Sequence, residues 1–167
     1  MTAAKPLTIA VPAIGVRSKL LYLGQTATGA MQTPAAGRYY NLAGWYKYSP
    51  TPGQLGPAVI AGHVDSAKDG PSVFFRLGRL RPHDTIYITR ADGSLAVFGV
   101  ESVHRYAKSQ FPSSAVYGNT NRAALRLITC GGAFDRTSHN YVDNIVVYAS
   151  LLRFTAGPKP TTTVARA

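Results

Sequence analysis

The stretch LRLITCGGAFDR, residues 125–136, contains the only cysteine of the chain, Cys130. The run ALRLITC over 124–130 is rich in apolar and β-branched residues, which predicts a strand that ends at the cysteine. Gly131 and Gly132 follow, and glycine lets another backbone approach closely. A lone cysteine is most often a small buried hydrophobe. At a strand end beside glycines, however, its thiol is open to a reaction partner.

The composition describes a globular chain with a large excess of positive charge. The 167 residues are 46% hydrophobic, which is enough for a substantial core. Lysine and arginine number 18 against 7 acidic residues, giving a net charge of +11. Such a charge suits a nucleic acid or an anionic surface such as a membrane or cell wall. The basic residues are scattered and no nucleic-acid-binding motif is present, so we expect no nucleic acid partner.

Apolar and β-branched runs recur along the chain and predict an all-β fold. They cover 7–16 with an interruption at Pro12, 18–26, 58–64, 84–90, 94–108, 124–130 and 141–152. Asp92-Gly93 marks a tight turn of the most distinct hairpin, because glycine accepts a positive φ there. Seven or eight strands at this spacing favour a barrel or a sandwich.

The remaining segments are predicted to be loops around a single domain. Residues 37–57 are rich in turn-forming residues, a short helical turn is expected near 72–77, and 109–123 is a long loop. Loops of that length inside a compact domain usually serve a function. We expect one catalytic domain over 1–154 and a disordered tail at 155–167, where Pro, Thr and small residues dominate.

A second apolar strand, AVIAGHV over 58–64, also ends in a glycine and a reactive side chain, His63. Neighbouring strands lie about 4.8 Å apart, so adjacent strand ends would bring His63 within reach of Cys130. The alternative is that His63 is a structural histidine. The other three histidines lie in a turn, a hairpin and a polar loop, where a surface or structural role is expected; they are His83, His104 and His139.

Arg136, six residues after Cys130, is the candidate third member of this group. Its guanidinium is always charged and offers several donors in a fixed fork. Such a group steadies negative charge that develops on a carbonyl oxygen. The alternative is a solvated loop arginine paired with Asp135. Arg126 and Arg122 are the other arginines considered for the role.

Three motifs together resemble the sortases, the cysteine transpeptidases of Gram-positive cell surfaces. The run LITC at 127–130 resembles their TLxTC signature, and 44–66 is similar to the segment that carries their histidine. The stretch CGGAFDRTSHNYVDNIVVYA at 130–149 resembles the actinobacterial class F group, with class E as the second choice. The resemblance covers about residues 7–152 and implies a closed eight-stranded β-barrel with short helical turns.

The same resemblance implies roles for individual residues. Cys130 would be the nucleophile, His63 its general acid/base, and Arg136 the arginine that positions substrate and supports the oxyanion. Many sortases carry this arginine at the start of the last strand, where this chain has Asn144. Substrate contacts are expected from the residues around the cysteine and from the loop at 109–123, namely Thr129, Ile128, Gly131 and Tyr117.

The implied reaction cuts an LPXTG-like sorting signal between Thr and Gly and joins the acyl group to an amine through a thioacyl enzyme. The amine would come from a cell-wall precursor or a pilin. The resemblance implies a monomer at the outer face of the cell membrane or in the cell wall, tethered by an N-terminal anchor missing from this chain. No cofactor or metal is expected, because one glutamate, six scattered aspartates, one cysteine and dispersed histidines give no ligand cluster.

Two other functions remain open from the residues alone. A non-catalytic basic β-domain that binds cell-wall or other anionic polymers would explain the charge and the tyrosines, but not the Cys–His–Arg set. An L,D-transpeptidase would carry a histidine shortly before its cysteine, whereas this chain has Leu127, Ile128 and Thr129 there. The binding domain requires an inert Cys130 thiol, whereas either transpeptidase requires a reactive one.

Overall fold

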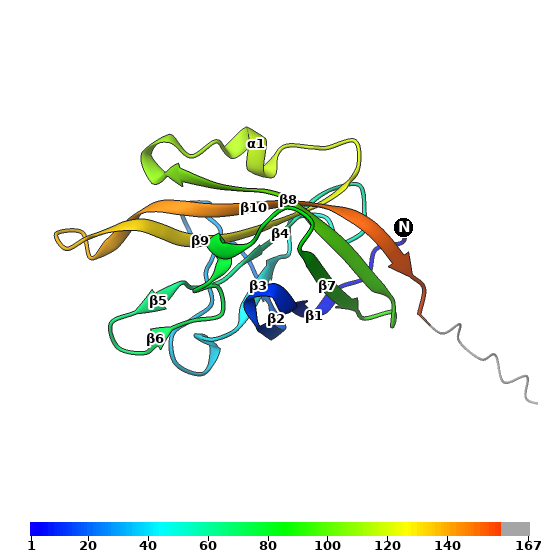
Figure 1. The fold of residues 1–167 in the computed structure, drawn as a ribbon, viewed down its shortest axis with the longest axis horizontal. Coiled ribbons are helices and arrows are strands. Elements are labelled where there is room, and N and C mark those ends of the chain that lie inside the picture. Colours follow the sequence, from blue (N-terminus) through cyan, green and yellow to red (C-terminus); the bar gives the residue numbers. More distant parts are fainter. Residues whose placement is uncertain (158–167) are drawn as a thin grey trace, which may run out of the picture.

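The computed structural model describes residues 1–157 and shows a closed β-barrel of eight strands (Figure 1). Around the barrel the order is β1-β2-β3-β4-β9-β10-β8-β7. The barrel strands are β1 (Pro6–Val11), β2 (Val16–Leu23), β3 (Ala43–Tyr46), β4 (Gly56–Ala61), β7 (Thr85–Arg90), β8 (Leu95–Ala107), β9 (Ala123–Asp135) and β10 (Asn140–Thr155). The predicted eight-stranded barrel is therefore confirmed.

The other elements are short and lie outside the barrel wall. Strands β5 (Asp65–Ser66) and β6 (Gly70–Pro71) form a separate two-stranded sheet. The helix α1 (Ser113–Tyr117) is the one α-helix among the described residues, and four 3-10 turns complete the elements: Pro12–Ile14, Gly37–Tyr39, Leu77–Arg79 and Lys108–Gln110. No helix within residues 1–157 has the length and apolar character needed to cross a bilayer.

The pairing of β4 with β9 is parallel, and it aligns two segments that are far apart in the sequence. Its register runs from Gly56 opposite Ala123 to Ala61 opposite Ile128. A parallel pair brings the carboxyl ends of both strands to the same edge. Strand β9 also pairs antiparallel with β10 on its other side. Residues that follow Ala61 and Ile128 therefore share one edge of the barrel.

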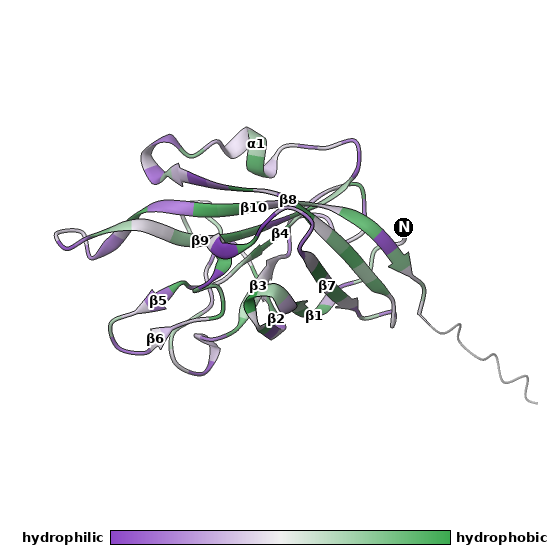
Figure 2. Ribbon diagram, in the orientation of Figure 1, coloured by the Kyte–Doolittle hydropathy of each residue, from purple (hydrophilic) through white to green (hydrophobic). Residues whose placement is uncertain are grey.

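The core is an apolar interior made by alternate residues of these strands. Fully buried members include Ile9, Ile60, Ile88, Leu125 and Leu127, each 0% exposed. The segment between β6 and β7 adds Phe74 and Leu77, also 0% exposed, so this connection closes one end of the barrel. Figure 2 shows the hydrophobic stretches along the barrel strands and hydrophilic residues at the tip of the β9–β10 hairpin.

Three local predictions differ from the structure. Segment 37–57 was predicted as loop alone but contains β3, and 109–123 contains α1. The strand predicted to end at Cys130 instead continues to Asp135, because β10 pairs with it across Gly131 and beyond. Most of the predicted tail, 158–167, lies outside the described residues, while Thr155 is the last residue of β10.

Replacing Leu127 by alanine tests how much the core-facing side of β9 contributes to the stability of the barrel. Its side chain is fully buried in the main core. We expect Leu127→Ala to lower the free energy of unfolding by about 2–5 kcal/mol, because the cavity is only partly refilled. Leu152, 67% exposed, is the matched control, and its alanine variant should stay within about 0.5 kcal/mol of the parent. Urea unfolding measures both, and equal losses would contradict this core assignment.

Candidate active site

A cleft of about 630 Å³ opens on the outer face of the barrel where β4 ends beside β9. Residues from β9, β10, the loop after β4 and α1 line it, among them Cys130, His63, Asn144, Thr129, Ile128 and Tyr117. A smaller hollow of about 350 Å³ lies elsewhere, near Arg17 and Arg76, and its lining includes neither cysteine nor histidine. The larger cleft is therefore the candidate site.

The strand register explains why Cys130 and His63 meet in this cleft. Ala61 lies opposite Ile128, so His63 and Cys130 each follow the last paired residue of their segment by two positions, and both line the cleft. On the other side of β9, Asn144 lies directly opposite Cys130. Cys130 is partly exposed rather than buried. Three neighbouring chain segments thus bring the Cys130 thiol, the His63 imidazole and the Asn144 carboxamide to the lining of the same cleft.

A buried hydrogen bond fixes the approach of the chain to His63. The hydroxyl of Thr129 donates to the carbonyl oxygen of Gly62 at 2.8 Å. Thr129 itself is 3% exposed, so water does not compete for this bond. Gly62 has no room for a side chain, since a Cβ there would lie 2.6 Å from Val73 Cγ1. The loop after β4 is therefore held against both β9 and the core.

The His63 ring has two further contacts that set its orientation. Its Nε2 lies 2.6 Å from the carbonyl oxygen of Pro34, and the Tyr40 ring stacks on it with centroids 5.3 Å apart. A carbonyl oxygen only accepts, so Nε2 carries the hydrogen in this bond. In the neutral ring, Nδ1 is then the nitrogen free to accept a proton. The Tyr40 hydroxyl donates to the Gly70 carbonyl oxygen at 2.6 Å, which holds the stacking ring in place.

A tyrosine and an aspartate that the sequence analysis did not single out connect the loop that carries His63 with strand β10. The Tyr141 hydroxyl, from β10, donates to Asp65 at 2.7 Å from Oδ1 and 2.9 Å from Oδ2. This bond is the main cause that raises the pKa of Tyr141 from 10.0 to about 12, with burial second. Asp65 follows His63 by two residues, so the bond ties the His63 loop to the hairpin that carries Cys130.

The glycines after the cysteine accommodate side chains of this chain itself. A Cβ on Gly131 would lie 2.7 Å from Ile145 Cγ1, and one on Gly132 would lie 2.1 Å from an Asp143 carboxylate oxygen. Gly132 also has a φ of +78°, which favours glycine. The space beside these glycines is thus filled by β10. Gly131 is buried and is not among the residues that line the cleft.

The helix α1 forms the opposite wall of the cleft. Its Val116 is fully buried and packs with Val59, Ile128 and Val146 in a second, smaller apolar cluster. This anchor brings the next residue, Tyr117, to the lining of the cleft, where it remains 39% exposed. The long loop at 109–123 therefore lies over the face of β9 that presents Ile128 and Cys130.

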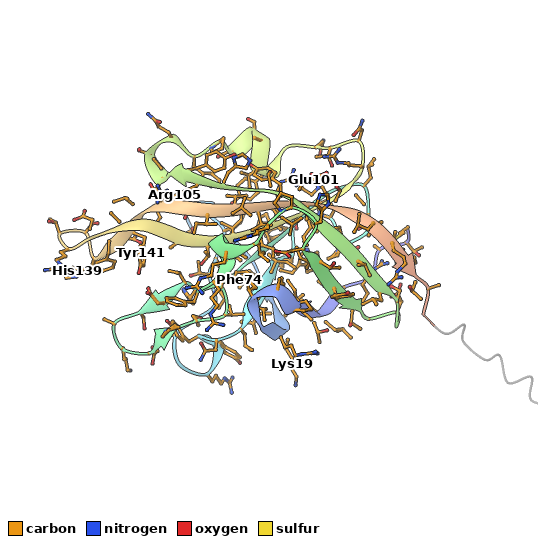
Figure 3. All side chains as sticks on the ribbon, viewed as in Figure 1. Lys19, Phe74, Glu101, Arg105, His139 and Tyr141 are labelled. Atoms are coloured by element: carbon orange, nitrogen blue, oxygen red, sulfur yellow. The ribbon has the colours of Figure 1, made fainter. Side chains whose placement is uncertain are left out.

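The arginines considered from the sequence lie outside the cleft lining. Arg136 is exposed in the turn at 136–139 between β9 and β10, at whose tip His139 projects (Figure 3). Arg126 is buried with its guanidinium 4.4 Å from the Tyr148 ring centroid, and burial lowers its pKa. Arg122 pairs with Glu101 at 3.1 Å. Among the described residues that line the cleft, none is an arginine or a lysine.

The Asp135 carboxylate, considered above as a partner for Arg136, is engaged elsewhere. It accepts hydrogen bonds from the Thr137 backbone at 2.8 Å and the Ser138 hydroxyl at 2.7 Å. Those bonds shape the turn itself. Across residues 1–157, no group of three or more His, Cys, Asp or Glu side chains is arranged to hold a metal ion.

Comparison with known proteins relates the whole barrel to one family. The family model described as the sortase domain matches residues 9–152. The pilus-related sortase C of Group B Streptococcus is 15% identical, with a TM-score of 0.66 over 92% of this chain and 69% of that one. Sortase A of Listeria monocytogenes is 19% identical, with a TM-score of 0.64 over 95% and 93%.

A third structure shares the fold over a smaller part of its length. Sortase A from Corynebacterium diphtheriae is 19% identical, with a TM-score of 0.65 over 92% of this chain. The chain spans 62% of that protein. A search of curated proteins finds no matching relative. At these identities the structural likeness concerns the fold alone.

The Tyr141–Asp65 bond gives a pH-dependent prediction. We expect Tyr141→Phe to lower the free energy of unfolding by about 1 kcal/mol at pH 7, the usual worth of one such bond. A raised pKa means that the contribution is fully present below the ordinary value of 10.0 and is lost as pH rises through about 12. Urea unfolding at pH 7, 9 and 11 measures the difference between variant and parent.

Tyr48→Phe is the control for this experiment, because Tyr48 is 63% exposed. Its variant should match the parent at all three pH values. A Tyr141→Phe difference that stays constant up to pH 11, or is absent at pH 7, would show that the bond does not contribute in solution.

Proposed function

The chain belongs to the sortase family of transpeptidases, and we propose that Cys130 and His63 carry out its acyl transfer. One observation supports this assignment most strongly. The parallel register of β4 and β9 runs to Ala61 opposite Ile128, two residues before His63 and Cys130, and both of these side chains line a single cleft in which the thiol is partly exposed. A nucleophile and a base within reach of one another are the minimal parts of covalent acyl transfer.

In the proposed first step the Cys130 thiolate attacks the carbonyl carbon of the scissile peptide bond. A carbon–sulfur bond forms and the carbonyl oxygen becomes an oxyanion. The carbon–nitrogen bond then breaks, and His63 gives a proton to the departing amine. Because Nε2–H faces the Pro34 carbonyl, the proton passes through Nδ1 of the ring. The product is a thioacyl enzyme.

In the proposed second step an incoming amine attacks the thioester. His63 takes a proton from that amine, the carbon–sulfur bond breaks, and the thiolate is restored. No external oxidant or reductant is needed, since one amide is exchanged for another. The partly exposed position of Cys130 gives the second amine access to the thioester.

The proposed substrate is an LPXTG-like sorting signal cut between Thr and Gly. Its residues would lie along the cleft, against Ile128 and Thr129 on one side and Tyr117 on the other. The backbone of Gly131, next to Cys130, is a further proposed contact. The mostly apolar wall made by Ile128 and Tyr117 suits the leucine and proline of such a signal. We assign the chain to the class F sortases, with class E as the second choice.

The setting of the reaction follows from the same proposal. The amine would belong to a cell-wall precursor or to a pilin lysine. The enzyme would act as a monomer at the outer face of the membrane or in the cell wall, held by an N-terminal anchor. The net charge of +11 suits work beside an anionic wall.

Ligation of a sorting peptide tests the nucleophile and the base. Incubation with an LPXTG-type peptide and an amine should yield a ligated product that mass spectrometry detects. Cys130→Ala should abolish it, since no thioester can form, and His63→Ala should lower the rate by at least about a hundredfold. His104→Ala, on the outer face of β8, is the matched control and should retain the parent rate.

The alternative function, a non-catalytic domain that binds anionic polymers, predicts other results. In that case Cys130 would resist alkylation by iodoacetamide, and Cys130→Ala would keep all function. Ligation by the Cys130→Ala variant would overturn the proposed mechanism.

Arg136 is proposed as the arginine that positions the sorting signal. From its turn it would contact substrate that extends beyond the cleft, and a charge-assisted hydrogen bond there supports an expected loss of about tenfold or more in kcat/KM for Arg136→Ala. Arg126→Ala should lose far less activity and chiefly reduce stability, because Arg126 is buried against Tyr148. The reverse order of activity losses would move the assignment to Arg126.

A further inference from the structure

Asn144 lies beside Cys130 in the cleft. It lies directly opposite Cys130 on β9 and opposite Tyr106 on β8. Directly opposed residues of an antiparallel pair have Cβ atoms about 4.5–5.5 Å apart and point to the same face. Asn144 and Cys130 also line the same cleft. The carboxamide and the thiol therefore reach toward the same substrate atoms.

The carboxamide of Asn144 is free to donate, while its polar neighbours are engaged. Within residues 1–157 the structure gives its side chain no hydrogen bond. By contrast, the Thr129 hydroxyl donates to the Gly62 carbonyl oxygen at 2.8 Å, and the Gln25 amide donates to the Tyr46 hydroxyl. A primary amide has two N–H donors. Asn144 thus offers two uncommitted donors next to the nucleophile.

The chemistry of the first step creates a need for such a donor. As the thiolate attacks, the carbonyl oxygen bonded to the attacked carbon gains negative charge. Donors already aimed at that oxygen lower the barrier without reorganising, above all where water is excluded. Val146, two residues along β10 from Asn144, is fully buried in the smaller apolar cluster, so apolar packing borders the carboxamide on that side.

We propose that the Asn144 carboxamide forms the side-chain part of the oxyanion hole, donating an N–H to the carbonyl oxygen that Cys130 attacks. Asn144 is then a catalytic residue in its own right, whereas Arg136 positions substrate from the hairpin turn. Stabilisation at the reacting atoms comes from a neutral dipole, because the lining described above includes no lysine or arginine. This inference rests on the proposed function of Cys130 as an acyl-transfer nucleophile.

The test compares two reactions of the same thiol. Acylation by p-nitrophenyl acetate passes through an oxyanion and releases p-nitrophenolate, whereas alkylation by iodoacetamide displaces iodide and forms no oxyanion. The ratio of the two rates cancels any change in thiolate content. Asn144→Leu keeps nearly the same side-chain shape without donors or charge. Asn140→Leu, on the same strand and exposed, is the matched control.

We expect Asn144→Leu to lower the acylation-to-alkylation ratio about tenfold or more. With a sorting peptide the acylation rate should fall by about a hundredfold to a thousandfold, as for other oxyanion-hole donors. Asn140→Leu should keep the parent ratio. An unchanged alkylation rate in Asn144→Leu also shows that its site remains folded.

The proposal is overturned if Asn144→Leu keeps the ratio within twofold of the parent, or if both leucine variants lower it equally. It is also overturned if the parent thiol forms no acetyl thioester. If the ratio falls only in Asn144→Leu while the parent fails to ligate any LPXTG-type peptide, the oxyanion role stands and the proposed sorting signal is wrong. The two failures are therefore distinguishable.

Discussion

The parallel pairing of β4 with β9 is the constraint on which the site depends. Its register runs to Ala61 opposite Ile128, so the segments that carry His63 and Cys130 start from neighbouring positions. A slip by one residue would turn the thiol to the opposite face of β9. The register is held by core residues on alternate positions of both strands, such as Ile60 and Leu127, which lie opposite each other and are fully buried.

Different lengths of the two strands turn this alignment into an open cleft. Strand β4 ends at Ala61, whereas β9 continues to Asp135 against β10. Beyond Ile128, β9 therefore lacks β4 as a neighbour on one side, and its side chains face the loop that carries His63. The continuing β10 keeps Cys130 on a regular strand and adds Asn144 beside it. Cys130 is therefore held by the pairing with β10 on one side of β9 and left accessible on the side where β4 has ended.

The sequence predicted most of the frame because the frame follows local patterns. The apolar runs and the Asp92-Gly93 turn were enough for every barrel strand except β3, and Cys130 and His63 both line the cleft. Strand β3 was missed because only Ala43–Tyr46 pair with neighbours, inside a segment rich in turn-forming residues. The end of β9 was misjudged because the glycines after Cys130 resemble a strand end unless the packing of Ile145 and Asp143 over them is known.

Sequence patterns could not predict the residues that contact the site from distant parts of the chain, because those contacts depend on how the strands pair. Tyr141 and Asp65 are joined by tertiary structure alone, and no spacing rule connects them. Asn144 appeared in the sequence as the position where an expected arginine was missing. Only the register of β10 against β9 turns that absence into a candidate donor. The physical information here lies in pairing between strands, which a single sequence does not specify.

The segment between β2 and β3 sets the orientation of the His63 ring, the proposed acid/base group. Pro34 contributes a carbonyl oxygen to Nε2 of His63, and Tyr40 contributes the stacked ring. Both contacts remain favourable when the imidazole is charged, since a carbonyl dipole and an aromatic face attract a cation. The two contacts therefore fix the orientation of the ring. The Tyr40 hydroxyl is in turn held by the Gly70 carbonyl oxygen, so segments that precede and follow His63 in the chain together hold its ring.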